Sequence, residues 1–151
     1  MRSLIAGSTI AAFALLSAQA HAETAYFSFV SPTVSQPGIH EFVFGATDPQ
    51  TIARLRDVVT NAGTLPARLD RVRGVITTER RAYNQDWPFH FVPSTVRFTE
   101  GLDAEACDAT PFEIESNLHL VGGSYLPRNE WCPYSMRLVR EVSVANPETQ
   151  E

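Results

Sequence analysis

A histidine surrounded by aromatic residues is the first place in this sequence where side-chain chemistry is expected. His90 stands within YNQDWPFHFVPSTVRF (residues 83–98), and Asp86 and Glu100 are acids that could orient it. A histidine that acts as a general base also needs a nucleophile to activate. The sequence has no G-x-S-x-G segment and no activated cysteine, so no catalytic residue is predicted. The segment is expected to be mostly core, with His90 on its less buried face and Tyr83 at its margin.

Metal ligation is the second chemistry to consider. His40, His90 and His119 show neither H-x-x-x-H nor H-x-H spacing, which zinc sites on one element often use. The acidic run from Glu100 to Glu115 lacks the glycine and the terminal glutamate of an EF-hand loop. Acids before and within the first turn of a helix also stabilise the helix dipole. The sequence therefore predicts no metal site and no cofactor.

Arginine supplies every basic side chain, and the net charge of −5 argues against a nucleic acid partner. Several arginines fall on the polar face of predicted strands, with two glutamates among them. They could form an anion-binding sheet face or, as we favour, cross-strand ion pairs in contact with water. The residues are Arg71, Arg73, Arg81, Arg97 and Arg137, with Glu79 and Glu141.

A loop rich in aromatic residues is the best candidate for a binding surface. The segment SYLPRNEWCPY (residues 124–134) carries tyrosine, tryptophan and arginine, which dominate protein interfaces, next to a cysteine that could hold the loop in place. We predict that binding uses this loop together with the margin of the aromatic segment. The predicted binding residues are Tyr125, Arg128, Trp131, Tyr134, Tyr83 and His90.

The first 22 residues have the organisation of a secretory signal peptide. One arginine precedes an apolar run too short to span a bilayer, and an A-x-A pattern ends at Ala22. The remaining residues, 23–151, are expected to form one domain with a frayed tail from about residue 145, and to stay out of the membrane. In an oxidising compartment Cys107 and Cys132 are expected to form a disulfide. The predicted location is secreted or periplasmic.

Periodicity predicts seven elements in residues 23–151. Strands are expected at 25–30, 40–46, 71–81, 87–98 and 135–144, where the fourth consists of two parts, 87–91 and 96–98, with a bend at Pro93. Helices are expected at 48–63 and 110–121, with Asp48 and Thr110 as their N-terminal caps. This order indicates an α+β fold, in which two helices pack on an antiparallel sheet of four to five strands. The disulfide leads us to expect the last strand beside the strand that precedes the second helix.

Four segments resemble a family of small domains similar to the N-terminal domain of a calmodulin-binding protein. They are EFVFGATDPQTI, YNQDWPFHFVPSTVRF, EACDATPFEIESNL and LPRNEWCPYSMRLVREV. The name of the family implies calmodulin as a partner. Calmodulin targets are basic amphipathic helices, whereas the first predicted helix has Arg54 and Arg56 against Asp57 and the second is acidic. The resemblance therefore implies a type of domain rather than this partner.

The sequence predicts a secreted or periplasmic module that acts by binding an unknown protein partner and is not an enzyme. One specific form of this function is the inhibition of a secreted hydrolase by the SYLPRNEWCPY loop. The alternatives are a small hydrolase-type enzyme, or a ligand carrier, that uses the aromatic strand around His90.

Overall fold

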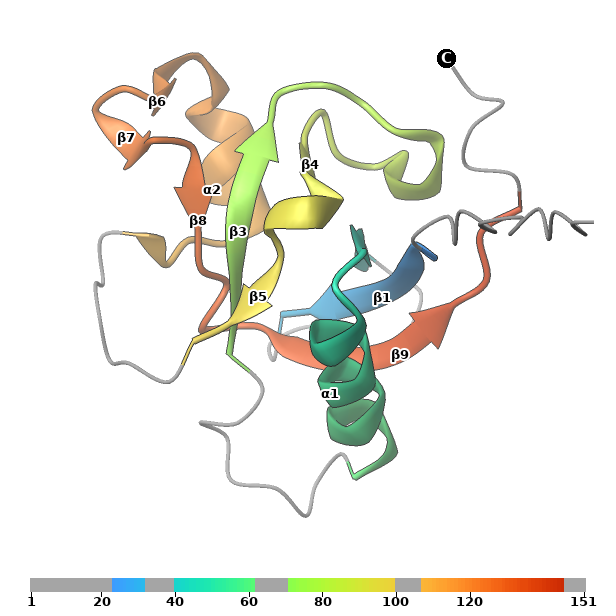
Figure 1. The fold of residues 1–151 in the computed structure, drawn as a ribbon. Coiled ribbons are helices and arrows are strands. Elements are labelled where there is room, and N and C mark those ends of the chain that lie inside the picture. The colour runs from blue at the N-terminus through green and yellow to red at the C-terminus, as the bar shows by residue number, and fades with distance from the viewer. Residues whose placement is uncertain (1–22, 32–39, 62–70, 100–106, 146–151) are drawn as a thin grey trace, which may run out of the picture.

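The computed structural model describes residues 23–31, 40–61, 71–99 and 107–145. The predicted signal peptide, Glu100 and residues 146–151 lie outside the described residues. In chain order the elements are β1 (Ala25–Val30), β2 (Phe42–Ala46), α1 (Pro49–Thr60), β3 (Val72–Thr77), η2 (Ala82–Asn84), β4 (His90–Phe91), η3 (Pro93–Thr95), β5 (Arg97–Phe98), α2 (Pro111–Ser116), η5 (Leu118–Leu120), β6 (Val121–Gly122), β7 (Tyr125–Pro127), β8 (Glu130–Trp131) and β9 (Arg137–Val142), where η marks a 3₁₀ helix (Figure 1). Among the described residues no helix is both long and apolar enough to cross a membrane.

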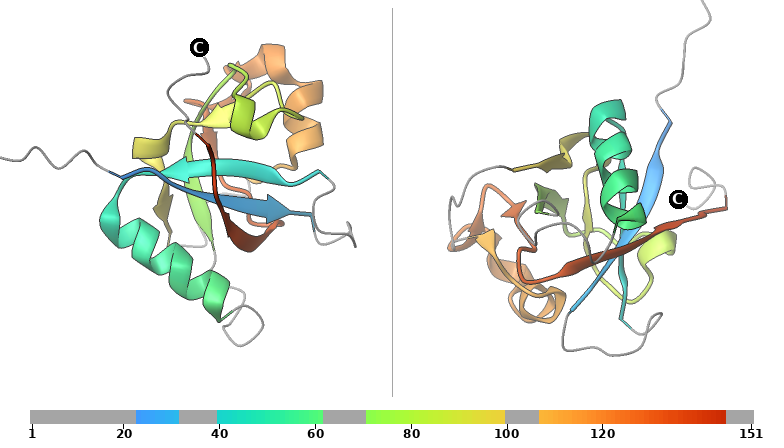
Figure 2. Two further views of the ribbon diagram at one scale, coloured as in Figure 1. Left: turned by 90° about the vertical axis from the view of Figure 1, so that its right-hand side faces the viewer. Right: turned by 90° about the horizontal axis from the view of Figure 1, so that it is seen from below.

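The strands form two antiparallel sheets and a short parallel pair. In the first sheet β1 lies between β2 and β9, and α1 packs against β9 (Figure 2). In the second sheet β3 pairs with β4, β5 and β8, and Figure 1 shows β8 on one side of β3 and the other two on the opposite side. The parallel pair joins β6 and β7. The α+β class and the two helices are confirmed, and the strands are divided between sheets.

The core lies where the two sheets meet, and aromatic side chains fill it. All six residues of β1 are buried, and Phe42 and Phe44 of β2 are fully buried. Their rings contact those of Trp87, Phe89 and Phe91, with ring centroids between 5.2 and 6.4 Å apart. The predicted role of the aromatic segment as core is thus confirmed. Such large rings bury much apolar surface in a small domain.

The helix starts follow the sequence signals. Asp48 Oδ2 accepts a hydrogen bond from Thr51 N at 2.7 Å, and Pro49 opens α1. Thr110 and Glu113 form the predicted capping box of α2. The predicted end of α2 is wrong. The helix stops at Ser116 because Asn117 caps it, and a 3₁₀ turn follows.

The disulfide between Cys107 and Cys132 is present, with a Cα–Cα distance of 5.1 Å. We predicted that it would place β9 beside β5, and this prediction is wrong. Cys132 directly follows β8, which pairs with β3, and the chain then turns before β9 joins β1. The loop before Cys132 contains its own short strands, and periodicity over two or three residues is too brief to reveal them.

Reduction of the disulfide is expected to lower the free energy of unfolding by about 3.5 kcal/mol, because it releases a cross-link between cysteines 25 positions apart. Urea unfolding of the oxidised and reduced protein, followed by tryptophan fluorescence, measures the difference. Both forms have the same sequence, so the oxidised protein is its own control. Equal unfolding midpoints would show that the cross-link contributes no stability.

Candidate functional site

The predicted binding residues do not form one surface, and Trp131 is the clearest error. Its side chain is fully buried, and its ring stacks on Phe91 with centroids 4.8 Å apart. Its indole Nε1 donates a hydrogen bond to the carbonyl of Ala109 at 2.9 Å. β8 pairs Trp131 with Gly74, where the absence of a side chain leaves room beside Phe91. Trp131 is therefore a core residue and not a contact for a partner.

His90 is also buried, contrary to its predicted place on the less buried face. Its Nδ1–H donates to the carbonyl of Glu79 at 2.8 Å, and its Nε2 accepts from Arg81 Nε at 3.3 Å. Burial lowers the pKa of His90; the bond to Glu79 opposes this effect, and the charge of Arg81 adds to it. With both ring nitrogens bonded, His90 has no free nitrogen to accept a proton from a substrate. The prediction failed because β4 has only two residues, and alternation along it does not show that Glu79 and Arg81 contact the His90 ring.

Tyr83 and Tyr134 lie away from the loop tip and are half-buried. Tyr83 packs on Tyr26 with ring centroids 4.9 Å apart, and burial raises the pKa of Tyr83 to about 12. Tyr134 lies under the guanidinium of Arg71, just before β3, and its buried hydroxyl has no hydrogen-bond partner among the described residues. Tyr125, by contrast, lies near Glu113 of α2.

Of the predicted binding residues, Arg128 is the one that stays exposed, in the turn that joins β7 to β8 at residues 128–129. The side chain of Arg128 is 86% exposed. Leu126, Arg128 and Asn129 have φ angles of 46°, 62° and 60°. Residues other than glycine rarely adopt this left-handed conformation, which costs about 1–2 kcal/mol per residue and is common at functional sites. A surrounding structure must hold such a turn in place.

Five contacts hold the turn. The side chain of Leu126 is buried, and Leu126 O accepts a hydrogen bond from Asn129 N at 2.9 Å. Asn129 O accepts another from Ile76 N of β3 at 2.9 Å. The side chain of Asn129 fills the space above Gly122, where a Cβ atom would overlap its amide oxygen. Cys132 fixes the end of β8 to Cys107. The turn is thus rigidly attached to the core while Arg128 points into solvent.

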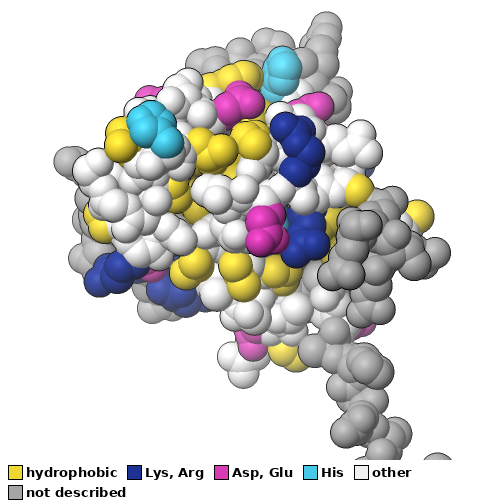
Figure 3. Space-filling model, turned by 90° about the horizontal axis from the view of Figure 1, so that it is seen from above, with side chains coloured by type: hydrophobic (Ala, Val, Ile, Leu, Met, Phe, Trp, Pro, Cys, Tyr) yellow, Lys and Arg dark blue, Asp and Glu magenta, His cyan; other side chains and the backbone are white. Residues whose placement is uncertain are grey.

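Two large apolar side chains are exposed among the described residues, and sequence analysis missed both. Phe112 of α2 is 49% exposed and Leu120 is 39% exposed, the largest such exposures among the described hydrophobic residues. The Phe112 ring packs edge-on against Trp87 and His40, with ring centroids 4.9 and 5.4 Å apart. Its neighbour on α2, Glu113, lies near Tyr125, and burial of that phenol, together with the charge of Glu113, raises the pKa of Tyr125. Leu120 precedes β6, which pairs with β7. Figure 3 shows hydrophobic side chains exposed on this upper side of the molecule. We define the turn face as Phe112, Leu120, Tyr125 and Arg128.

The arginines of the second sheet form ion pairs around Glu130, the interpretation that we favoured. Glu130 Oε1 accepts from Arg73 Nε and from Arg97 Nη2, both at 2.9 Å, and Arg128 lies 3.5 Å from Oε2. Burial raises the pKa of Glu130, but these guanidinium groups outweigh burial and the net shift is downward. Sequence analysis did not single out Glu130. It named Glu79, which pairs with Arg81, and Glu141, which pairs with Arg56 of α1.

No metal cluster is found in the part of the chain that the structure describes: no three His, Cys, Asp or Glu side chains there could hold one ion.

Residues 23–145 match the model of the BP-74 N-terminal domain family. The chain belongs to this family. The resemblance that the four sequence segments indicated is thereby confirmed. No curated protein and no solved structure matches the chain. Function in this family member must therefore be argued from its own residues.

The ion-pair cluster around Glu130 gives the stability of this family member a pH dependence. Since the pKa of Glu130 is lowered on folding, its contribution is complete above the unfolded pKa of about 4.3 and disappears as the pH falls through the folded value. Glu130→Gln is expected to cost about 1–2 kcal/mol at pH 7, since Arg73 then loses a mostly buried, charged partner. The difference from the unaltered protein should shrink as the pH falls below the unfolded pKa and should vanish once the folded carboxylate is protonated.

Thermal or urea unfolding between pH 7 and 3 measures this effect. Glu115→Gln is the matched control, because Glu115 is exposed on α2 and its carboxylate makes no ion pair with a described residue. A stability difference for Glu130→Gln that stays constant with pH would rule out the ionised carboxylate as its source.

Proposed function

We propose that this protein is a secreted or periplasmic module that binds another protein through the turn face and has no catalytic activity of its own. The observation that carries the proposal is the exposed Arg128 on a left-handed backbone that the core and the disulfide hold in place. A surface ordered before binding loses less conformational entropy when the partner arrives. Backbone strain at an exposed position, held by surrounding structure, also favours a functional interpretation.

The composition of the turn face favours a protein partner. Arginine and aromatic side chains dominate the energetics of protein interfaces. Tyr125 and Arg128 supply them around the turn, and Phe112 supplies an exposed ring on α2. Arg128 contacts Glu130 only at 3.5 Å, so its guanidinium retains donors for a carboxylate of the partner. We therefore expect an acidic group opposite Arg128 and an apolar recess for Phe112.

Export is part of the proposal and rests on three features. Residues 1–22 have the organisation of a signal peptide, and the family match begins at residue 23. The disulfide suits an oxidising compartment. The partner would therefore be another secreted, periplasmic or cell-surface protein.

Inhibition of a secreted hydrolase is the more specific form of this function. A peptide that binds like a protease substrate is extended, whereas Arg128 has a φ of 62° and occupies a tight turn. An inhibitory turn would therefore cover the entrance of an active site and would not lie in the cleft as a strand. The alternative of catalysis by His90 is less favoured because both of its nitrogens are engaged.

A charge-reversal experiment tests the turn face. The protein is recovered without reducing agent from the periplasm or medium of its producing cells, and native mass spectrometry identifies a stoichiometric protein companion. Calorimetry on the purified pair then compares Arg128→Glu with Arg137→Glu. Both arginines are exposed, but Arg137 lies on β9, in the other sheet. We expect at least about tenfold weaker binding for Arg128→Glu and for Phe112→Ala, and no change for Arg137→Glu.

Two results would contradict the proposal. One is a companion that binds Arg128→Glu and Phe112→Ala as tightly as the unaltered protein. The other is the absence of any protein companion from both compartments. Circular dichroism of each variant ensures that a loss of binding does not come from unfolding.

A further inference from the structure

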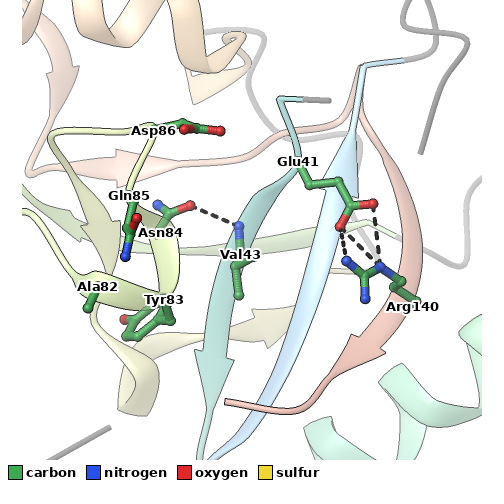
Figure 4. Close-up of a pocket in the computed structure, with 8 residues that line it drawn as sticks. All are labelled: Glu41, Val43, Ala82, Tyr83, Asn84, Gln85, Asp86 and Arg140. Atoms are coloured by element: carbon green, nitrogen blue, oxygen red, sulfur yellow. Dashed lines mark hydrogen bonds and ion pairs between the residues drawn. The ribbon is translucent and has the colours of Figure 1, made fainter. Parts of the chain in front are cut away.

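A polar cavity on another part of the molecule is a candidate small-molecule site. It has a volume of about 310 Å³, near the lower limit for small-ligand pockets, and lies between η2 and the first sheet (Figure 4). Tyr83, Gln85 and Asp86 line one wall. Val43 lies at the base, and Glu41 and Arg140 line the opposite wall. None of these residues belongs to the turn face, so this site is independent of the proposed protein-binding function.

The wall that η2 forms is fixed to the sheet by Asn84. The Asn84 side chain is buried, and its Oδ1 accepts a hydrogen bond from Val43 N of β2 at 2.9 Å. Its Nδ2 donates to the carbonyl of Phe89 at 3.1 Å. Arg80 donates a hydrogen bond to the carbonyl of Gln85. One bond thus fixes η2 to the sheet, and two local bonds fix the shape of the η2 segment.

One wall carries the carboxylate of Asp86, and the opposite wall carries a guanidinium nitrogen of Arg140 that can still donate hydrogen bonds. Arg140 uses Nε and Nη2 to bind the buried carboxylate of Glu41, at 3.1 and 2.9 Å from Oε2, which leaves Nη1 without a partner among the described residues. The Arg140 side chain is 53% exposed, so Nη1 is open to a ligand. Asp86 is exposed and its carboxylate makes no ion pair or hydrogen bond with a described residue. In Figure 4 the Asp86 carboxylate points across the cavity toward the wall of Glu41.

We propose that this cavity binds a small zwitterion of the amino-acid type, with its ammonium at Asp86 and its carboxylate at Nη1 of Arg140. The Glu41–Arg140 pair is neutral overall, so the lining has one unbalanced carboxylate and one guanidinium edge with free donors. A simple anion in the cavity would be repelled by Asp86, and a simple cation would leave the free donors of Arg140 Nη1 unpaired. A ligand with both charges satisfies both walls. Tyr83 offers an apolar ring surface to the ligand's side chain.

Blocked amino acids separate the two halves of this recognition. The purified disulfide-bonded protein is titrated with L-leucine, L-glutamate and L-arginine, and the backbone amide signals of Val43, Asn84 and Gln85 are followed by NMR. N-acetyl-L-leucine lacks the ammonium, and L-leucinamide lacks the carboxylate. We expect at least one free amino acid to shift these signals below about 10 mM, and L-leucine to bind roughly tenfold more tightly than either blocked form.

Variants of the two charged residues provide the second test. Asp86→Asn is expected to weaken binding about tenfold, whereas Glu115→Gln, which removes an exposed carboxylate on α2, should leave it unchanged. Arg140→Lys retains a cation for Glu41 but lacks the free guanidinium edge, so it should also weaken binding. The inference is overturned if no free amino acid shifts the cavity signals, if the blocked forms bind as tightly, or if Asp86→Asn and Arg140→Lys bind like the unaltered protein.

Discussion

Burial of Trp131 is the interaction on which the rest of this structure depends. The indole lies between the two sheets, with ring contacts to Phe42 of the first sheet and Phe89 and Phe91 of the aromatic segment. Its N–H bond to Ala109 ties the same side chain to the segment before α2. Its neighbour Cys132 binds Cys107 both through the disulfide and through a backbone hydrogen bond of 2.8 Å. One short stretch therefore joins both sheets and α2.

The exposed turn between β7 and β8 follows from this anchoring. β8 is held on β3 by Trp131 and Cys132, and β7 is held by the buried Leu126. The residues between them have little freedom and adopt left-handed φ angles, at a cost that burial of Leu126 and Trp131 offsets. Glu130 adds an electrostatic connection, since its carboxylate joins arginines of β3 and β5. The same forces that complete the core thus fix the position of Arg128 in solvent.

Local sequence signals predicted the local features of the fold. Asp48 and Thr110 cap their helices, Pro93 begins the turn between β4 and β5, and alternation in 72–77 placed Val72 and Ile76 inside. The errors involve contacts between distant segments. Neither Trp131 nor His90 shows in its own neighbours that another segment will cover it. β9 has one extra residue, Val139, between its Ser28–Arg140 and Phe29–Leu138 pairs, and no local pattern reveals such a bulge.

A preformed turn is the central claim, and residual dipolar couplings of the free, oxidised protein test it most directly. The backbone couplings of Leu126, Arg128 and Asn129 should fit the left-handed φ angles, with the same order as residues of β3. That result would show that the surface exists before any partner binds. Couplings averaged toward zero in these three residues, beside well-ordered values in β3, would contradict the account.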